Sequence, residues 1–120
     1  MQYMLSNRAR LALLDIRDNI GFARQFVAGL SFSEFQNDRR TFYAVTRCIE
    51  IISEAARGLP PDVPERHPNL PWRAIFGVGN VYRHDYDNVA EEFVWRTVQQ
   101  SLQPLLEAVE KEIAALAQQD

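Results

Sequence analysis

The chain has 120 residues, enough to bury one hydrophobic core and too few for two, so a single domain over residues 1–120 is expected. Hydrophobic residues make up 47% of it, and its one cysteine has no partner for a disulfide, which is typical of a globular protein from a reducing compartment. No apolar run approaches the roughly 20 residues of a membrane span, and the first residues lack the pattern of a signal peptide. These features predict a cytoplasmic protein with no membrane partner.

The net charge of −3 argues against a protein that coats nucleic acid non-specifically, because that mode needs a strong positive field. Twelve of the thirteen basic residues are arginine, whose planar guanidinium suits carboxylate or phosphate, and Lys111 is the exception. Residues 1–96 balance twelve arginines against twelve acidic residues, so the acidic excess lies in residues 97–120. A local phosphate site is therefore compatible with the composition.

Apolar residues at steps of three and four predict a first amphipathic helix near residues 7–28. Its stripe consists of Leu13, Ile16, Ile20, Ala23 and Val27. Gly29 is expected to end this helix. Ser31 and Glu34 fit a capping box, so a new helical piece is predicted to start near residue 32.

The same periodicity then predicts a long second helix that ends at Gly58, a natural C-terminal cap. Its apolar positions are Phe42, Val45, Ile49, Ile52 and Ala56. Residues 59–71 hold five of the six prolines, and each proline lacks an amide donor and restricts the residue before it. We therefore expect an ordered or extended loop there, with neither helix nor central strand.

Pro71 suits the first position of a third, shorter helix that is expected to end near His84. Asp87 or Asn88 can cap a fourth helix that extends almost to the C terminus. The apolar positions of this fourth helix are Val94, Val98, Leu102, Leu105, Val109, Ile113 and Leu116. No segment alternates with period two, so no sheet is predicted. The expected fold class is all-α, an antiparallel bundle of four to five helices joined by short turns.

The stretch GNVYRHDY, residues 79–86, lies where the apolar pattern of the third helix breaks. At 100° per residue, Gly77, Asn80 and His84 share one face of that helix, away from its apolar side. One interpretation is a polar turn in which the helix dipole stabilises a cationic histidine. The other is an active site, because histidine transfers protons near neutral pH.

A larger pattern surrounds this stretch. Its most specific features are Pro71 with Trp72, Asn80 four residues before His84, a tyrosine two residues after that histidine, and a later helix with Trp95. The segment PWRAIFGVGNVYRHDYDNVAEEFVWRTVQQSLQPLLEAVE, together with IEIISEAARGLP and LALLDIRDNIGFARQFVAGLSFSEFQND, resembles the HepT-like proteins of the HEPN superfamily. These are small all-helical toxins paired with a minimal nucleotidyltransferase antitoxin, and the resemblance spans nearly the whole chain.

The resemblance implies a metal-independent endoribonuclease toxin that needs no cofactor and forms a homodimer, with two copies of the motif facing each other. His84 would act at the ribose 2′-hydroxyl or the leaving oxygen of RNA, and Asn80 and Arg83 would contact the phosphate. In the family the antitoxin transfers adenylyl groups from ATP to the tyrosine of the motif, which corresponds to Tyr86.

The family's motif reads arginine, four residues, histidine, one residue, tyrosine, and this sequence has Gly79 at the arginine position. Arg83 could supply the missing charge, either in place or across a dimer, although neighbours on a helix point about 100° apart. The alternative function is a catalytically weakened module that binds a nucleotidyltransferase or a nucleic acid without cutting. A small residue at position 79 would also permit close helix packing.

Other candidate sites have less support from the sequence. A metal site needs a cluster of ligands, yet His67, the other histidine, lies seventeen residues from the first in the proline-rich segment. Cys48 falls in the apolar middle of the second long helix and is expected to be packed.

Three arginines repeat every seven residues on the first helix: Arg10, Arg17 and Arg24. This stripe could meet RNA or an acidic partner, or it could be a solvated flank. Glu50 and Glu54 lie one turn apart and could do acid/base chemistry, but Arg47 and Arg57 are near enough to pair with them, which favours a structural role.

Overall fold

The computed structural model describes residues 2–81 and 87–119, and it places the side chains of residues 7–77 and 90–118. The described residues contain seven α-helices and one π-helical turn, joined by turns and loops: α1 (Gln2–Val27), α2 (Phe32–Gln36), α3 (Arg39–Arg57), α4 (Asp62–Arg66), α5 (Trp72–Val81), α6 (Asp87–Arg96), the π turn η1 (Thr97–Ser101) and α7 (Leu102–Gln119). No strand occurs in the described part of the chain, which confirms the predicted all-α class.

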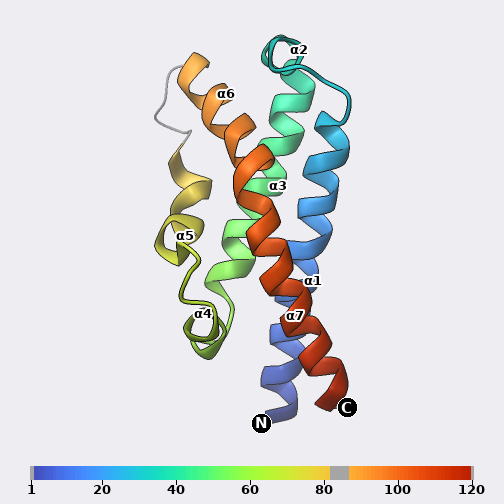
Figure 1. Cartoon of the computed structure of the whole chain (residues 1–120), viewed down its shortest axis with the longest axis vertical. Coiled ribbons are helices and arrows are strands. Elements are labelled where there is room, and N and C mark those ends of the chain that lie inside the picture. The colour runs from blue at the N-terminus through green and yellow to red at the C-terminus, as the bar shows by residue number, and fades with distance from the viewer. Residues whose placement is uncertain (1, 82–86, 120) are drawn as a thin grey trace.

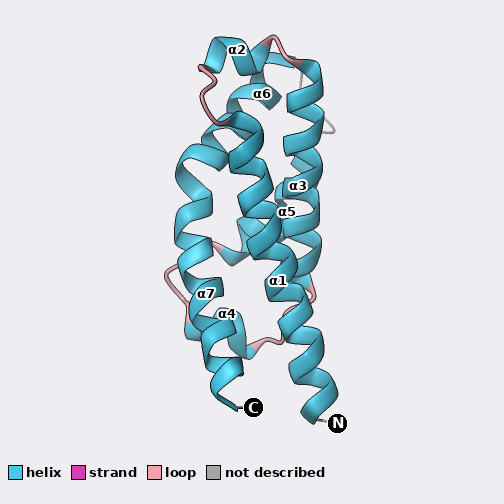
Figure 2. Cartoon of the chain, turned by 90° about the vertical axis from the view of Figure 1, so that its right-hand side faces the viewer, coloured by secondary structure: helices cyan, strands magenta, loops and turns pink. Residues whose placement is uncertain are grey.

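The long helices form an elongated bundle with extents of 47 × 27 × 23 Å. Helix α1 lies between α3 and α7 and runs antiparallel to both (Figures 1 and 2). Helix α5 packs on α3 at the side of the bundle, whereas α2 lies near the start of α3 at one end of the bundle and α4 lies near the opposite end of α3 (Figure 1). The end of α5 and the start of α6, which flank the GNVYRHDY stretch, therefore lie at the side of the bundle.

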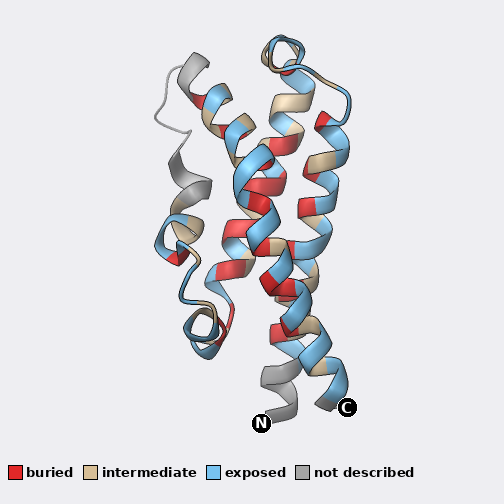
Figure 3. Cartoon of the chain, in the orientation of Figure 1, coloured by how far each residue is buried: buried red, intermediate tan, exposed pale blue. Residues whose placement is uncertain are grey.

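The predicted apolar stripes form the core. Figure 3 shows the buried positions gathered along the facing sides of α1, α3 and the α6–α7 run. All five stripe positions of α1 are at most 5% exposed, and Phe35 of α2 is fully buried. Phe42, Ile113 and Leu116 are only half-buried and pack against this core from its margin. None of the described helices is long and apolar enough to cross a membrane.

The local signals at the first chain reversal are confirmed. The amide of Glu34 donates to the Ser31 hydroxyl at 3.1 Å, and the Glu34 carboxylate accepts from the Ser31 amide at 2.9 Å, which completes the capping box. Gly29 follows α1 with a φ of 79°, a conformation that glycine adopts without a steric penalty. Gly58 is the C-terminal cap of α3, as expected.

The prediction that no helix runs within residues 59–71 is wrong, because α4 forms there. Pro64 lies in the first turn of this helix, where backbone amides have no partner inside the helix, so its missing N–H costs nothing. The amides of Val63 and Glu65 donate to the carbonyls of Pro60 and Pro61 at 3.0 and 3.3 Å. Clustered prolines thus start a short helix here.

The predicted fourth helix is one continuous helical run, but η1 divides it into α6 and α7. Pro104 explains the position of the π turn: it has no amide to donate to the carbonyl of Gln100, and its ring would displace that carbonyl. The wider turn just before it absorbs this conflict. The Thr97 hydroxyl, which donates to the Phe93 carbonyl at 2.8 Å, adds a second local perturbation.

Candidate functional site

The structure describes the helix that leads into the predicted site, but most of the predicted site residues lie outside the described part of the chain. Gly79 and Asn80 are in the last turn of α5, and their backbone is helical as expected. Arg83, His84 and Tyr86 lie outside the described residues. The side chain of Asn80 also lies outside the placed ones. The geometry that can be analysed is therefore the scaffold that holds α5.

Helix α3 binds the backbone of α5 just before the motif. The Ser53 hydroxyl donates to the carbonyl oxygen of Phe76 at 2.8 Å, and Nη1 of Arg57 donates to the same oxygen at 2.6 Å. Arg57 also donates to the Ser53 hydroxyl at 2.8 Å, so the three groups form a closed set of hydrogen bonds. Ser53 is fully buried, and Phe76 is three residues before Gly79. These hydrogen bonds fix the position of α5 along the axis of α3.

A second cluster ties the segment before α5 to α7. The Glu112 carboxylate accepts two hydrogen bonds from Arg66, at 2.6 and 3.0 Å, and Nε2 of His67 lies 2.7 Å from its second oxygen. Because a carboxylate only accepts hydrogen bonds, Nε2 of His67 carries the hydrogen. The Glu112 side chain is only 9% exposed. Its hydrogen bonds from Arg66 lower the pKa of Glu112 against the opposing effect of burial, and the same pair raises the pKa of Arg66.

Trp72 connects the two clusters. Its indole N–H donates to the carbonyl of His67 at 2.8 Å, and its ring lies 6.1 Å from that of Phe76, centroid to centroid. Contacts therefore run from Glu112 on α7 through His67 and Trp72 to Phe76 on α5, whose carbonyl accepts hydrogen bonds from Ser53 and Arg57 of α3. The start and the middle of α5 are both held, which defines where its last turn enters residues 82–86.

Neither cluster was predicted from the sequence, although one signal was present. Glu112 interrupts the apolar stripe of the last helix between Val109 and Ile113, and a carboxylate at a core-facing position requires a partner. The expected pairing of Glu50 and Glu54 with arginine is confirmed for Arg47, whose Nη1 lies 3.9 Å from both. Arg57 instead turns to α5.

The remaining candidates from the sequence are Cys48, a metal site and the arginine stripe of α1. Cys48 is buried, and burial raises the pKa of its thiol, so the prediction of a packed cysteine is confirmed. Among the described residues no group of histidine, cysteine and carboxylate side chains is placed to hold a metal ion. In the arginine stripe of α1, Arg17 pairs with Asp18 at 3.2 Å in solvent, whereas Arg24 donates to Gln103 of α7 at 2.7 Å.

Comparison with known proteins adds to this geometry. The family model described as Ribonuclease HepT-like matches residues 16–112. A relative from Thermococcus cleftensis, named "Probable ribonuclease HepT", is 33% identical over 99 residues, which cover 82% of this chain and 90% of that protein. A Methanocaldococcus jannaschii protein named as a candidate RNase is 32% identical over 98 residues, covering 82% and 90%. No solved structure gives a significant match.

A third relative, from Caldanaerobacter subterraneus subsp. tengcongensis and also named as a candidate RNase, is 36% identical over 92 residues, covering 77% of this chain and 81% of that protein. With its bundle of α-helices and no described strand, the chain falls in the class of HEPN-like helical domains. Within that class it belongs to the HepT-like ribonuclease family, as the resemblance in its sequence predicts.

Proposed function

We propose that this protein is an endoribonuclease that cleaves RNA in the cytoplasm without a metal ion. Its membership of the HepT-like family supports this function. The observation that carries the proposal is the sequence run of Asn80, His84 and Tyr86, which begins in the last turn of α5, while two hydrogen-bond clusters hold this helix and the segment before it. His84 is the proton-transfer group, and Asn80 and Arg83 contact the phosphate.

RNA contains its own nucleophile, so the protein needs to supply only proton transfer and charge stabilisation. The ribose 2′-oxygen bonds to phosphorus, the bond to the 5′-oxygen breaks, and a proton passes from the 2′-hydroxyl to the leaving oxygen. His84 mediates that transfer, and the guanidinium of Arg83 stabilises the negative charge on the phosphoryl oxygens. The test is cleavage of RNA by the purified protein in the presence of EDTA. A strict requirement for magnesium would contradict this mechanism.

Gly79 favours a second candidate function. The position that holds arginine in the family's motif has no side chain here, which removes one phosphate contact. The alternative is a catalytically weakened module that binds a nucleotidyltransferase or a nucleic acid without cutting. RNA that is bound by the intact protein and stays uncleaved over long incubation would favour this alternative.

We also propose a homodimer in which two copies of the motif face a shared groove. Twofold dimers with isologous interfaces are the commonest soluble oligomers, and such pairing would let Arg83 of one protomer act beside His84 of the other. Sedimentation at micromolar concentration should show this dimer, and a protein that stays monomeric would argue against it.

Regulation through Tyr86 is the next proposal. A cognate nucleotidyltransferase antitoxin would transfer an adenylyl group from ATP: the phenol oxygen of Tyr86 attacks the α-phosphorus, and diphosphate leaves. The added phosphodiester repels the RNA backbone beside His84. After co-expression with the nucleotidyltransferase, intact-mass analysis should show an adenylyl adduct that Tyr86→Phe loses and Tyr82→Phe keeps. An unmodified chain in a tight, inactive complex would mean inhibition by occlusion alone.

Arg57 has a predicted positioning role in this reaction. Replacing it with glutamine removes the charged donor to the Phe76 carbonyl, so α5 shifts against α3 and the motif moves with it. Small displacements of reacting groups are costly, and we expect cleavage to fall about tenfold while the free energy of unfolding changes by about 1 kcal/mol. Arg57→Lys should restore part of the rate, because a lysine can donate to the same carbonyl.

The matched control is Arg47→Gln, which removes an exposed arginine ten residues before Arg57 on the same helix α3. Cleavage kinetics and urea unfolding are measured for each variant. Equal losses of cleavage in the two variants would show that net charge, and not the position of α5, explains the effect.

A further inference from the structure

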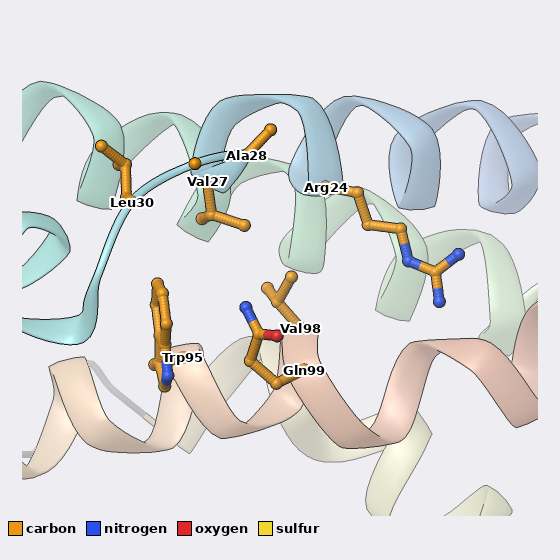
Figure 4. A pocket seen from close by; sticks show the side chains of 8 residues that line it. Arg24, Val27, Ala28, Leu30, Trp95, Val98 and Gln99 are labelled. Carbon is orange, nitrogen blue, oxygen red and sulfur yellow. The ribbon is translucent and has the colours of Figure 1, made fainter.

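A cleft of about 460 Å³ opens where the end of α1 meets α6 and η1, within the range of sites that bind small ligands. Figure 4 shows Trp95, Val98 and Gln99 rising from one wall, with Val27 and Leu30 opposite them and Arg24 toward one end. The cleft therefore combines an aromatic ring, an apolar floor, an amide and a cation.

The aromatic ring is held in a fixed orientation. Trp95 contacts Phe32 edge to face at 5.9 Å and Phe35 at 5.3 Å between ring centroids. It is half-buried, and it borders a second hollow lined by Phe32, Glu92 and Arg96. A tryptophan that is packed on one side and open to a cleft offers a rigid surface on which a nucleobase can stack.

Arg24 supplies the positive charge. Its guanidinium has five N–H donors and gives one hydrogen bond, from Nη2 to the Gln103 side chain at 2.7 Å. Within the part of the chain that the structure describes, no carboxylate lies at ion-pair distance from Arg24, whereas Arg17 on the same stripe is paired with Asp18. An oriented and uncompensated guanidinium suits a phosphate group.

Gln99 completes the chemistry of the cleft. Its side chain belongs to η1 and offers both a donor and an acceptor, which is what the polar edge of a base requires. The π turn brings Gln99 and Val98 to the cleft beside Trp95 (Figure 4). Inserted π turns occur frequently at functional sites.

We propose that this cleft binds one nucleotide unit of single-stranded RNA, with its base stacked on Trp95 and bonded to Gln99, and its phosphate bound by Arg24. The proposal rests on the proposed ribonuclease function for its choice of RNA. Trp95 is eight residues after Asp87, the first residue of α6, which is about 12 Å along the helix. In this proposal the cleft is a substrate subsite separate from the residues proposed for catalysis.

Fluorescence of Trp95 tests the proposal directly. Trp72→Phe leaves Trp95 as the single tryptophan, and His84→Ala in the same chain keeps the RNA intact. We expect a short oligouridylate to quench Trp95 saturably. Adding Arg24→Gln should weaken binding about tenfold. The slope of the logarithm of the binding constant against the logarithm of the salt concentration should fall by about the contribution of one phosphate contact. Gln99→Ala should weaken binding to a smaller extent.

The matched control is Arg17→Gln, which removes the same charge one heptad earlier and outside the cleft. It should leave the affinity unchanged. Filter binding with Arg24→Gln and Arg17→Gln in a chain that keeps both tryptophans repeats the comparison without Trp72→Phe. Equal affinities of these two variants, or RNA binding without quenching of Trp95, would overturn the proposal. Uridine monophosphate binding as tightly as the oligomer would also overturn it, because the site would then serve a free nucleotide.

Failure of this proposal can be distinguished from failure of the ribonuclease function. If the protein does not cleave RNA but RNA quenches Trp95 and Arg24→Gln weakens this quenching, the proposed binding cleft is supported and the proposed ribonuclease activity is contradicted. If the protein cleaves RNA and the fluorescence of Trp95 does not respond to RNA, the ribonuclease activity is supported and the proposed binding cleft is contradicted.

Discussion

Replacing His84 with alanine is expected to reduce metal-free RNA cleavage by about 10²- to 10⁴-fold, the range that proton transfer by a positioned side chain contributes. The expectation follows from the proposed role of His84 as the only group at the motif that transfers protons near neutral pH. Cleavage is followed with a labelled RNA in EDTA, and circular dichroism checks that the helical content is unchanged.

His67→Gln is the control for this experiment, because it removes the other histidine of the chain. His67 contacts Glu112 between α4 and α7 and belongs to the cluster that holds the start of α5, so its replacement should lower stability and reduce cleavage by no more than the roughly tenfold loss expected for Arg57→Gln, far less than His84→Ala. If His84→Ala cuts RNA as fast as the unmodified protein, the mechanism is wrong. Loss of cleavage in both variants without unfolding would also count against a specific role for His84.

The second large effect is expected at Glu112. Glu112→Gln replaces a buried carboxylate that accepts two hydrogen bonds from Arg66 and one from His67, and it leaves those donors without a matching charge. We expect a loss of about 2 kcal/mol in the free energy of unfolding at pH 7, near the lower end for charged hydrogen bonds because Arg66 is half exposed. Urea unfolding measures it, and Glu110→Gln, an exposed neighbour on α7, should change little.

The same variant gives a pH test with a defined sign. Arg66 holds the pKa of Glu112 in the folded protein below its ordinary value of 4.5. The stabilisation is therefore present above about pH 4.5 and is lost as the pH falls through the lowered pKa, where the carboxylate binds a proton. The difference in stability between the unmodified protein and Glu112→Gln should shrink below pH 4.5. A difference that stays constant down to pH 3 would contradict this account.

The prolines show how far local rules extend. The prediction from the sequence treats the five prolines of residues 59–71 as helix breakers, yet Pro64 sits in the first turn of α4, where its lack of an amide is harmless. Pro104 has the opposite position, inside a helical run, and η1 precedes it. Both outcomes follow from local geometry, so the position of each proline within a helix matters more than the number of prolines.

The sequence by itself determined the helical class, the core-facing stripes of the long helices, the capping box at Ser31 and the family motif around His84. These features depend on neighbours three or four residues apart or on the order of residues, and both are present in the chain before it folds. That motif identifies the family without any coordinates.

Only the tertiary structure decided which side chains meet. Arg66 binds Glu112 across 46 residues, Arg57 binds the Phe76 carbonyl across 19, and Arg24 binds Gln103 across 79. Periodicity tells which face of a helix is buried, but the partner of a polar group at the edge of that face depends on the rotation and height of the neighbouring helix. The rotation of the neighbouring helix and its position along the bundle axis are set by packing of the whole core. This packing places Arg24 and Trp95 in one cleft, and it positions α5 so that its last turn leads into the motif.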